Sequence, residues 1–346
     1  MQAVRVDRES AEDAQLAGLV LCHELRFDDG RVAIPKGRVL DTDDVARALT
    51  LTWSELHLLT LDPGDVHEDE AGSRLARLVA GNGIEVGAAA AGHWPLVAVH
   101  RGLLTIASQA LEDVNTLDGP CVYSLLHGQV VEAGEVVARA KVIPFAVTAE
   151  TMSNVERIAA ATEGVIGVRS FLPHRVGGVV QESLGERAVA KFRVAVAEKL
   201  GWFGSSICAL ETVAPGVDAI AAGFAAVHNA GADIILVAGT KAMDALDPTF
   251  GALKNLGARM VRHGVPAHPG SLLWLADWNG VPVVGMPTCG LFAQATAFDL
   301  VIARLLTGER LDDRALARLA EGGFLTRAMS FRLPAYRAAA ERGAVE

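Results

Sequence analysis

The chain has 346 residues, 51% hydrophobic and only 5% aromatic, and its 41 acidic and 31 basic residues give a formal net charge of −10. This length suggests two or three domains, and a composition rich in Ala, Val and Leu is typical of packed α/β layers and excludes a disordered chain. The negative charge, without a local basic patch, disfavours nucleic acid and anionic membrane as partners. The opening "MQAVRVDRES" is charged and no window approaches the roughly 18 apolar residues of a membrane span, so we expect a soluble, cytoplasmic protein.

The first half of the chain predicts two small units. Residues 1–60 alternate short apolar runs with turn signals, which indicates a small mixed α/β unit. Residues 61–170 predict a helix, a β-rich region and a connecting helix. The first of these helices, in "DPGDVHEDEAGSRLARLVAGNG", has an acidic first turn followed by apolar residues at helical spacing. The segment "GQVVEAGEVVARAKVIPFAV" reads as a β-hairpin with Gly134 at its turn.

Residues 171–308 predict an α/β domain of repeated strand and helix units. Its apolar runs are typical of buried strands, and "DIILVA" is too continuously apolar for a half-exposed strand. The segment "GVDAIAAGFAAVHNAG" has apolar residues at helical spacing and ends at Gly231. We therefore predict a doubly wound, mostly parallel sheet from about residue 174 to 308, with ligand chemistry at the loops after the strands. Residues 309–346 predict a helical tail.

Four turns that follow strands are candidates for chemistry, namely 181–186, 239–247, 268–271 and 286–290. Neither G-x-G-x-x-G at a strand–helix junction nor G-x-x-x-x-G-K-[ST] occurs, which disfavours dinucleotide oxidoreductases and P-loop NTPases. The G-x-S-x-G and H-E-x-x-H motifs are also absent from the sequence, so serine hydrolases and zincins have no support.

The second of these turns concentrates charged residues. Asp247 followed by Pro248 is a strong helix start, because Asp accepts a hydrogen bond at the N-cap and Pro at N1 sacrifices none. Asp244 and Asp247, together with backbone oxygens, are of the type that holds Mg²⁺, and Lys241 is of the type that meets a phosphate. A cap and solvated loop charges explain the same residues, so both interpretations stay open at this point.

The order and spacing of these segments resemble the molybdopterin-binding domain shared by molybdopterin molybdenumtransferases and molybdopterin adenylyltransferases. The matching segments are "DIILVAGTKAMDALDP", "ALKNLGARMVRHGV", "HPGS", "VPVVGMPTCG" and "LFAQATAFDLVIARLLTGE". Upstream, "EDEAGSRLARLVAG" and the segment from Gly128 to Val147 look like the N-terminal regions of molybdenumtransferase-like proteins, so the resemblance extends over most of the chain. It implies a three-layer C-terminal domain of the molybdopterin-binding type.

The resemblance also implies a site. The phosphate and pterin of molybdopterin would lie in a groove lined by the loops around Gly239, Pro269-Gly270 and Pro287, and Asp247 takes the position of the family's loop aspartate, associated with Mg²⁺ or with positioning the reacting group. We therefore predict Asp244 and Asp247 as catalytic and metal-binding residues. The predicted cofactor-binding residues are Glu182, Ser183, Gly239, Thr240, Lys241, His268, Pro269, Gly270, Ser271, Pro287, Thr288 and Cys289.

The chain departs from the family's pattern in its ligand loops. The family's T-G-[SD]-E is here Gln181-Glu182-Ser183, and its Gly-Gly turn keeps one glycine, Gly239. Its Lys-Pro-Gly-Lys becomes His268-Pro269-Gly270-Ser271, which removes two fixed positive charges from an anion-binding loop. Backbone N–H groups at helix starts and Lys241 are able to compensate, so binding is better supported than catalysis. Cys289 is either a reactive thiol or a small residue in a tight turn.

Several functions fit these observations. The first is an enzyme of molybdenum cofactor assembly that assists molybdate insertion, with Mg²⁺ at Asp244 and Asp247 and charge stabilisation by Lys241. The second is a non-catalytic carrier or maturation partner of a molybdenum hydroxylase or other cofactor-assembly protein. A third is a nucleotide-pyrophosphate hydrolase on the same scaffold, and a fourth is a scaffold whose ligand site has decayed. Apolar residues in the tail predict packing on another domain or subunit, and we expect a homo-oligomer; these are Leu316, Leu319, Phe324 and Phe331.

Overall fold

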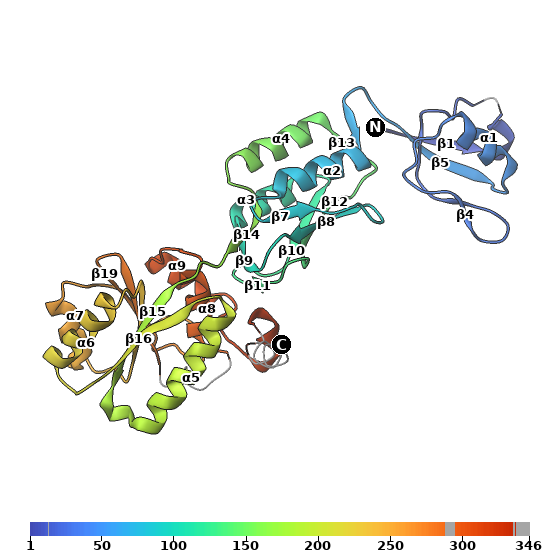
Figure 1. The fold of residues 1–346 in the computed structure, drawn as a ribbon. Helices are drawn as coiled ribbons and strands as arrows, with labels where there is room; N and C mark the ends of the chain where they lie inside the picture. Colours follow the sequence, from blue (N-terminus) through green and yellow to red (C-terminus); the bar gives the residue numbers. More distant parts are fainter. Residues whose placement is uncertain (13, 288–294, 335, 337–346) are drawn as a thin grey trace. The chain divides into compact units, whose positions relative to one another are not determined.

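The computed structural model describes residues 1–12, 14–287, 295–334 and 336, which mix helices with several sheets in two compact units (Figure 1). Unit 1 comprises Met1–His100, Thr105–Leu125 and Ala133–Val168. Unit 2 comprises Arg101–Leu104, Leu126–Glu132 and Arg169–Glu346. Within the described part of the chain, the helices are all too short or too polar to cross a membrane.

The first 60 residues of unit 1 have an apolar core of their own. A three-stranded antiparallel sheet has the order β1–β5–β2. Helix α1 begins after Asp41, whose side chain accepts a hydrogen bond from the N–H of Asp44 in a capping box. Leu21, Ile34 and Leu56 are fully buried in this core. The elements are β1 (Gln2–Asp7), β2 (Val20–Leu21), β3 (Leu25–Arg26), β4 (Val32–Ile34), α1 (Thr42–Thr50) and β5 (Glu55–Thr60).

The remainder of unit 1 is built on a four-stranded antiparallel sheet in the order β10–β12–β8–β7. Helix α2 packs on it closely, because Gly72 leaves room for the ring of Trp94, which a Cβ at this position would approach to 2.1 Å. The elements are β6 (Asp65–His67), α2 (Glu68–Val79), β7 (Ile84–Val86), β8 (His93–Ala98), α3 (Ser108–Thr116), β10 (Pro120–Ser124), β12 (Val136–Val142), β13 (Ala146–Thr148) and α4 (Ala149–Ala160).

The predicted hairpin around Gly134 is wrong. Strand β11 (Val130–Val131) pairs with β9 (Gly102–Ile106), whereas β12 pairs with β8 and β10, so the two strands belong to different sheets. Gly134 does turn the chain, with a φ of 83°, but its N–H donates to the carbonyl of Ala98. Alternation of apolar residues indicates two strands and a turn, and it does not identify the partner of each strand.

Unit 2 contains a six-stranded sheet in the order β16–β15–β17–β20–β19–β18. The first four strands run parallel to one another, and β19 is antiparallel to both of its neighbours, β20 and β18. Strand β14 (Ile166–Ser170) begins in unit 1 and ends in unit 2. The elements after it are β15 (Arg175–Gln181), η2 (Glu182–Leu184), α5 (Glu186–Trp202), β16 (Ser206–Val213), α6 (Val217–Asn229), β17 (Ile234–Ala238), α7 (Pro248–Asn255), β18 (Arg259–His263), β19 (Trp274–Trp278), β20 (Val281–Gly285), α8 (Ala297–Leu305), α9 (Asp313–Ala317), η4 (Arg318–Ala320) and η5 (Arg327–Arg332).

The antiparallel part of the sheet follows from one tight turn. Asn279 and Gly280 separate β19 from β20 and have φ values of 54° and 86°. Two successive residues of positive φ are the requirement of the type I′ hairpin turn, for which Asn-Gly is the preferred pair. Because this turn joins β19 directly to β20, the two strands must pair antiparallel.

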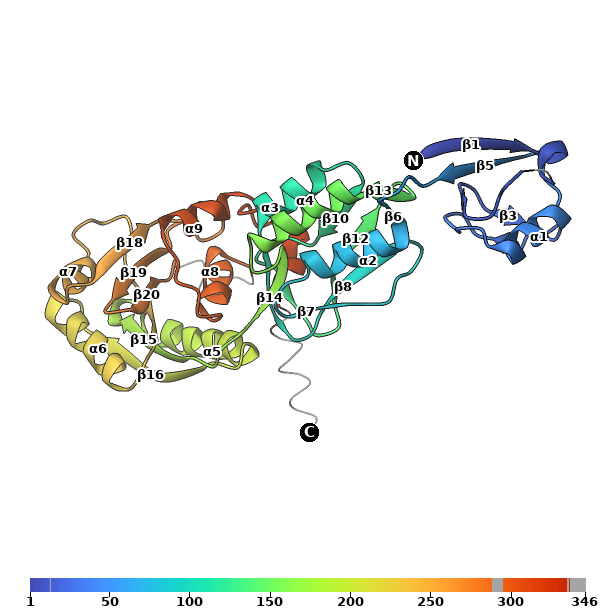
Figure 2. The ribbon, with the colours of Figure 1, turned by 90° about the horizontal axis from the view of Figure 1, so that it is seen from above.

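The sheet of unit 2 has two apolar faces. In β17, which is buried at all five positions, Ile235 and Val237 pack in a core with α6 and α7, whereas Ile234 and Leu236 pack in a second core with α5 and α8. Figure 2 shows α6 and α7 on one side of these strands and α5 and α8 on the other. The expectation that "DIILVA" is an interior parallel strand covered on both faces is confirmed, since β17 pairs in parallel with β15 and β20.

The tail after α8 belongs partly to the core of unit 2. Leu316 is fully buried and Leu319 packs against the same core as α8. Phe324 and Phe331 are 72% and 61% exposed. Leu316 and Leu319, two of the four residues predicted to dock on another domain or subunit, therefore pack inside unit 2. The homo-oligomer stays a prediction.

Candidate functional site

Three of the four predicted loops leave the sheet of unit 2 at one edge, which we call the carboxyl edge. Strands β15, β17 and β20 are parallel neighbours, and the register aligns Val180 with Ala238 and Val237 with Gly285. The segments that start at Glu182, at Gly239 and at Met286 therefore begin side by side. Ligands of open parallel α/β sheets bind at this kind of edge.

Gly239 brings the first two loops into contact. Its φ is +99°, and a Cβ built on it would lie 2.9 Å from Cβ of Gln181 and 3.4 Å from the backbone N of Gln181. A side chain is thus excluded by both the backbone conformation and the space. The single glycine that the chain retains here is the one that lets the β17 loop lie against the end of β15.

Asp247 fixes the shape of the β17 loop from within. The side chain is 4% exposed, its Oδ1 accepts a hydrogen bond from the N–H of Thr249 at 2.9 Å, and its Oδ2 accepts one from the N–H of Lys241 at 2.8 Å. The first bond caps α7, whose N1 residue is Pro248, as the sequence predicts. The second bond closes the loop across six residues, so one carboxylate determines both its start and its end.

A buried polar network supports the same loop. Gln181 Nε2 donates to Thr249 Oγ1 at 2.9 Å, and the hydroxyls of Thr249 and Thr240 lie 3.2 Å apart. Gln181 and Thr249 are buried. Neither is among the site residues predicted from the sequence. The available signal was a glutamine directly after the apolar run "RVGGVV", since a polar side chain at the end of a buried strand requires a partner.

The carboxylates predicted to bind Mg²⁺ both form backbone hydrogen bonds. Asp244 is exposed, and its Oδ1 accepts from the N–H of Leu246 at 3.0 Å, while both oxygens of Asp247 accept from N–H groups. Across the described residues, no three His, Cys, Asp or Glu side chains gather as ligands of a metal ion. Mg²⁺ binding by Asp244 and Asp247 stays a prediction.

The loop at 268–271 reaches the residues that follow β20. The carbonyl of Pro269 accepts a hydrogen bond from the N–H of Ala297, the first residue of α8, at 2.8 Å. Gly270 has a φ of +108°, and a Cβ on it would lie 3.0 Å from Cβ of Ala297 and 3.5 Å from Cγ of Pro287. His268 and Ser271 are exposed beside this contact. Thr288 and Cys289 lie outside the described residues.

A buried charged cluster stabilises the first turn of α8. Asp299 is fully buried, and its Oδ2 accepts hydrogen bonds from the N–H and the hydroxyl of Thr296 at 2.9 and 3.2 Å. Its Oδ1 accepts from Lys199 Nζ and, at 3.1 Å, from the hydroxyl of Tyr336. Burial, with the Asp299 charge as a further cause, raises the pKa of Tyr336 well above its usual value. This cluster was not predicted, because its members are far apart in the sequence.

A mostly apolar groove of about 560 Å³ lies between α5 and β16, with Val189, Val194 and Leu210 among its lining residues. Glu182 and Glu186 also line it. Arg193 lines it as well, so two carboxylates and one guanidinium leave the groove with a net negative charge, which disfavours a phosphate there. The predicted recognition of an anion is therefore left to the loops at 239–247 and 268–271.

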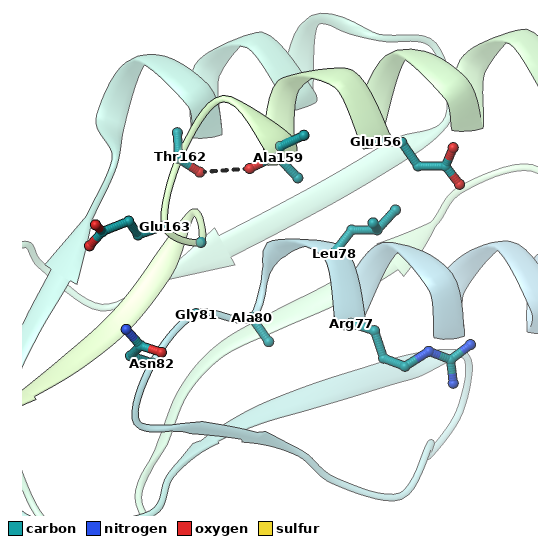
Figure 3. A pocket seen from close by; sticks show the side chains of 11 residues that line it. Arg77, Leu78, Ala80, Gly81, Asn82, Glu156, Ala159, Thr162 and Glu163 are labelled. Atoms are coloured by element: carbon teal, nitrogen blue, oxygen red, sulfur yellow. Dashed lines mark hydrogen bonds between the residues drawn. The ribbon is translucent and has the colours of Figure 1, made fainter.

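Unit 1 has a second cavity, of about 470 Å³, at the C-terminal ends of α2 and α4. In Figure 3 Arg77 extends from α2 and Glu156 from the facing α4, and the Thr162 hydroxyl donates to the carbonyl of Ala159 at 3.0 Å. Glu156 accepts from Arg74 at 2.7 Å, so its charge is already paired. None of the residues predicted for the site lines this cavity.

No known family's sequence model matches the chain, and no curated protein matches it. Among solved structures, the molybdopterin biosynthesis MoeA protein from Pyrococcus horikosii is 14% identical, with a TM-score of 0.31 over 72% of this chain and 80% of that one. A molybdenum cofactor biosynthesis protein from Pyrococcus furiosus is 12% identical, with a TM-score of 0.25 over 89% of this chain and 65% of that one. Likeness at these TM-scores establishes neither family nor function.

Proposed function

We propose that the chain binds molybdopterin, or a related pterin that carries a phosphate, at the carboxyl edge of unit 2. The observation that supports this most is the convergence of loops that the sequence resemblance assigns to this ligand. Gly239 lies against Gln181, and Gly270 lies against Ala297 and Pro287. The proposed role is in the biosynthesis or delivery of the molybdenum cofactor.

The phosphate would be met by the β17 loop. The side chain of Lys241 is exposed, while its backbone N–H is held by Asp247. The ammonium group of a lysine acts as a point charge, and here only its side chain, not its backbone, has to become ordered when it meets a phosphate.

The pterin ring would be met by apolar side chains of the same loop. Met243 and Leu246 are 84% and 91% exposed. A flexible thioether makes favourable contact with flat aromatic rings, and a neighbouring leucine extends the apolar surface. The loop between Gly239 and Asp247 therefore offers a positive charge to the phosphate of the ligand and an apolar surface to its pterin ring.

A non-catalytic role is favoured over Mg²⁺-dependent chemistry. Each oxygen of Asp247 already accepts a backbone N–H, and a cation bound there would compete with those bonds. The chain would then act as a carrier that holds the cofactor and passes it to a molybdenum hydroxylase or another assembly protein. In the alternative, a molybdenumtransferase-like enzyme, Asp244 and Asp247 would hold Mg²⁺ during molybdate insertion.

The test is calorimetric titration of molybdopterin into the wild-type protein, Lys241→Ala and Lys254→Ala. Lys254 is an exposed lysine in the last turn of α7 and serves as the matched control for loss of one charge. We expect saturable binding to the wild type, a loss of about tenfold or more in Lys241→Ala from one lost charged hydrogen bond, and no change in Lys254→Ala.

The outcomes separate the candidate functions. A wild-type protein that does not bind molybdopterin contradicts the proposal, and an equal loss in both lysine variants would mean that only net charge matters. Binding that is unchanged by Mg²⁺ and molybdate supports the carrier, whereas Mg²⁺-dependent product formation supports the enzyme. Hydrolysis of nucleotide pyrophosphates without pterin affinity would identify a hydrolase.

A further inference from the structure

Arg332, at the end of η5, is a buried cation that no acidic side chain of the described chain neutralises. It is 6% exposed, its Nη1 donates to the carbonyl of Gly322 at 2.6 Å, and its Nε has no hydrogen-bond partner among the described residues. The other buried arginine of unit 2 differs, because Arg304 Nε donates to Glu309 at 3.0 Å. Burial lowers the pKa of Arg332, and no neighbouring charge opposes that shift.

The hydrogen bonding of Arg332 leaves one side of its guanidinium available. Nη1 is committed to Gly322, whereas Nε is unpaired and Nη2 forms no hydrogen bond with the described residues. Nε–H and Nη2–H are the pair of donors that point the same way and match two oxygens of a carboxylate or phosphate. A buried guanidinium is stable where an anion meets such donors, and costly where none does.

The tail places Arg332 next to elements of the carboxyl edge. Both backbone groups of His268 form hydrogen bonds with the tail. Its N–H donates to the carbonyl of Gly323 and its carbonyl accepts from the N–H of Leu325, each at 2.8 Å. Gly322, which holds Arg332, directly precedes this contact. Further along, Tyr336 donates to Asp299 in the first turn of α8. Along the chain, Arg332 therefore stands between two attachments of the tail, one to the 268–271 loop and one to the helix that this loop contacts.

We propose that Arg332 is an anion-binding residue of this site, and that the tail supplies to the phosphate of the ligand the fixed positive charge that the 268–271 loop lacks. This inference rests on the proposed function for the phosphate-bearing ligand. It adds to the proposed site a residue of the tail, which lies outside the loops that follow the strands of the sheet. The guanidinium binds two phosphate oxygens through Nε and Nη2 while Nη1 stays on Gly322.

The test uses thermal unfolding of the full chain with increasing inorganic phosphate at constant ionic strength set with chloride. The variants are Arg332→Met, Arg332→Lys and the matched control Arg318→Met, which removes one exposed arginine of the same tail. We expect phosphate to raise the Tm of the wild type and of Arg318→Met. Without phosphate, Arg332→Met should match or exceed the wild-type Tm, because it replaces a buried unpaired charge with an apolar side chain.

With phosphate, Arg332→Met should lose the rise in Tm, which corresponds to an apparent affinity weaker by about tenfold or more. Arg332→Lys keeps the charge but not the paired donors and should retain only part of the rise. Should Arg332→Met fail to fold, the lysine variant decides: a full phosphate response in it contradicts the proposal, and a reduced one supports it.

Three results would overturn the inference. They are a wild-type Tm that does not respond to phosphate, a response lost equally in Arg318→Met, and a lower Tm of Arg332→Met with its phosphate response intact, which would make Arg332 a structural residue only. The proposed function fails separately. A wild type that binds molybdopterin but shows no Arg332-dependent phosphate response contradicts this inference alone. A wild type that shows the Arg332-dependent phosphate response but does not bind molybdopterin contradicts the pterin ligand alone.

Discussion

Two buried charges in unit 2, Asp247 and Arg332, differ in how the chain satisfies them. Asp247 has a backbone N–H on each oxygen, and both bonds lie within one loop. Arg332 has one carbonyl on Nη1, and its Nε has no partner in the part of the chain that the structure describes. Since an unpaired buried polar group is costly, the fold alone explains the first residue and leaves the second unexplained. Asp247 therefore serves the architecture of the loop, whereas Arg332 is the residue for which we propose a ligand.

The largest effect should come from Asp247→Ala. It removes the cap of α7 and leaves the N–H of Lys241 without its acceptor, so the free energy of unfolding should fall by about 2–4 kcal/mol. Urea denaturation measures this change. The matched control is Asp244→Ala, an exposed carboxylate in the same loop, which should change stability by less than about 0.5 kcal/mol. Equal effects of the two variants would contradict the structural role of Asp247.

The next effect concerns the contact between two loops of the carboxyl edge. Gly239→Ala places a methyl group 2.9 Å from Cβ of Gln181 at a φ of +99° and should destabilise the protein by about 2–3 kcal/mol. Gly257→Ala is the control, because its φ is +71° but no atom lies within 4 Å of the added Cβ, so backbone strain alone should cost about 1 kcal/mol. A Gly239 variant no worse than the control would mean that the loops do not pack together.

A smaller effect is expected from Tyr336→Phe, and it depends on pH. The raised pKa of Tyr336 means that the folded chain keeps the phenolic proton at pH values where the unfolded chain loses it. This stability is fully present below the unfolded pKa of about 10 and is lost as pH rises through the folded pKa. At neutral pH the variant should lose about 1–2 kcal/mol, for the hydrogen bond to Asp299.

The pH profile of Tyr336→Phe is measured by urea denaturation at pH values above and below the unfolded pKa of tyrosine, about 10. Above that pKa the wild type should lose stability faster than the variant, by about 1.4 kcal/mol per pH unit, so the two converge. Tyr123→Phe is the control, because Tyr123 is the other tyrosine and is exposed. A constant difference between wild type and Tyr336→Phe at all pH values would contradict the burial of this phenol with Asp299.

The sequence predicts those parts of unit 2 that depend on neighbouring residues. The continuous apolar run at β17 indicates an interior strand, and Asp247 with Pro248 indicates the start of α7. Both follow from local rules, since burial on two faces requires apolar residues at every position and a helix start requires an acceptor.

The rest of the site depends on contacts between distant residues. Gln181 meets Thr249 68 residues later, and Tyr336 meets Asp299 37 residues earlier. Neither pairing has a periodic signal, because hydrophobic patterning records which face is buried and not which polar groups meet. The wrong hairpin at Gly134 has the same cause, since strand patterning identified strands without their partners.

The most direct test of the central claim is hydrogen exchange of the full chain with and without saturating molybdopterin. If the carboxyl edge binds the ligand, exchange should slow at residues 181–186, 239–241 and 268–271 and stay unchanged at residues 77–82, which line the cavity of unit 1. Protection confined to residues 77–82 and 156–164, or protection nowhere, would contradict the assignment of the ligand to the sheet of unit 2.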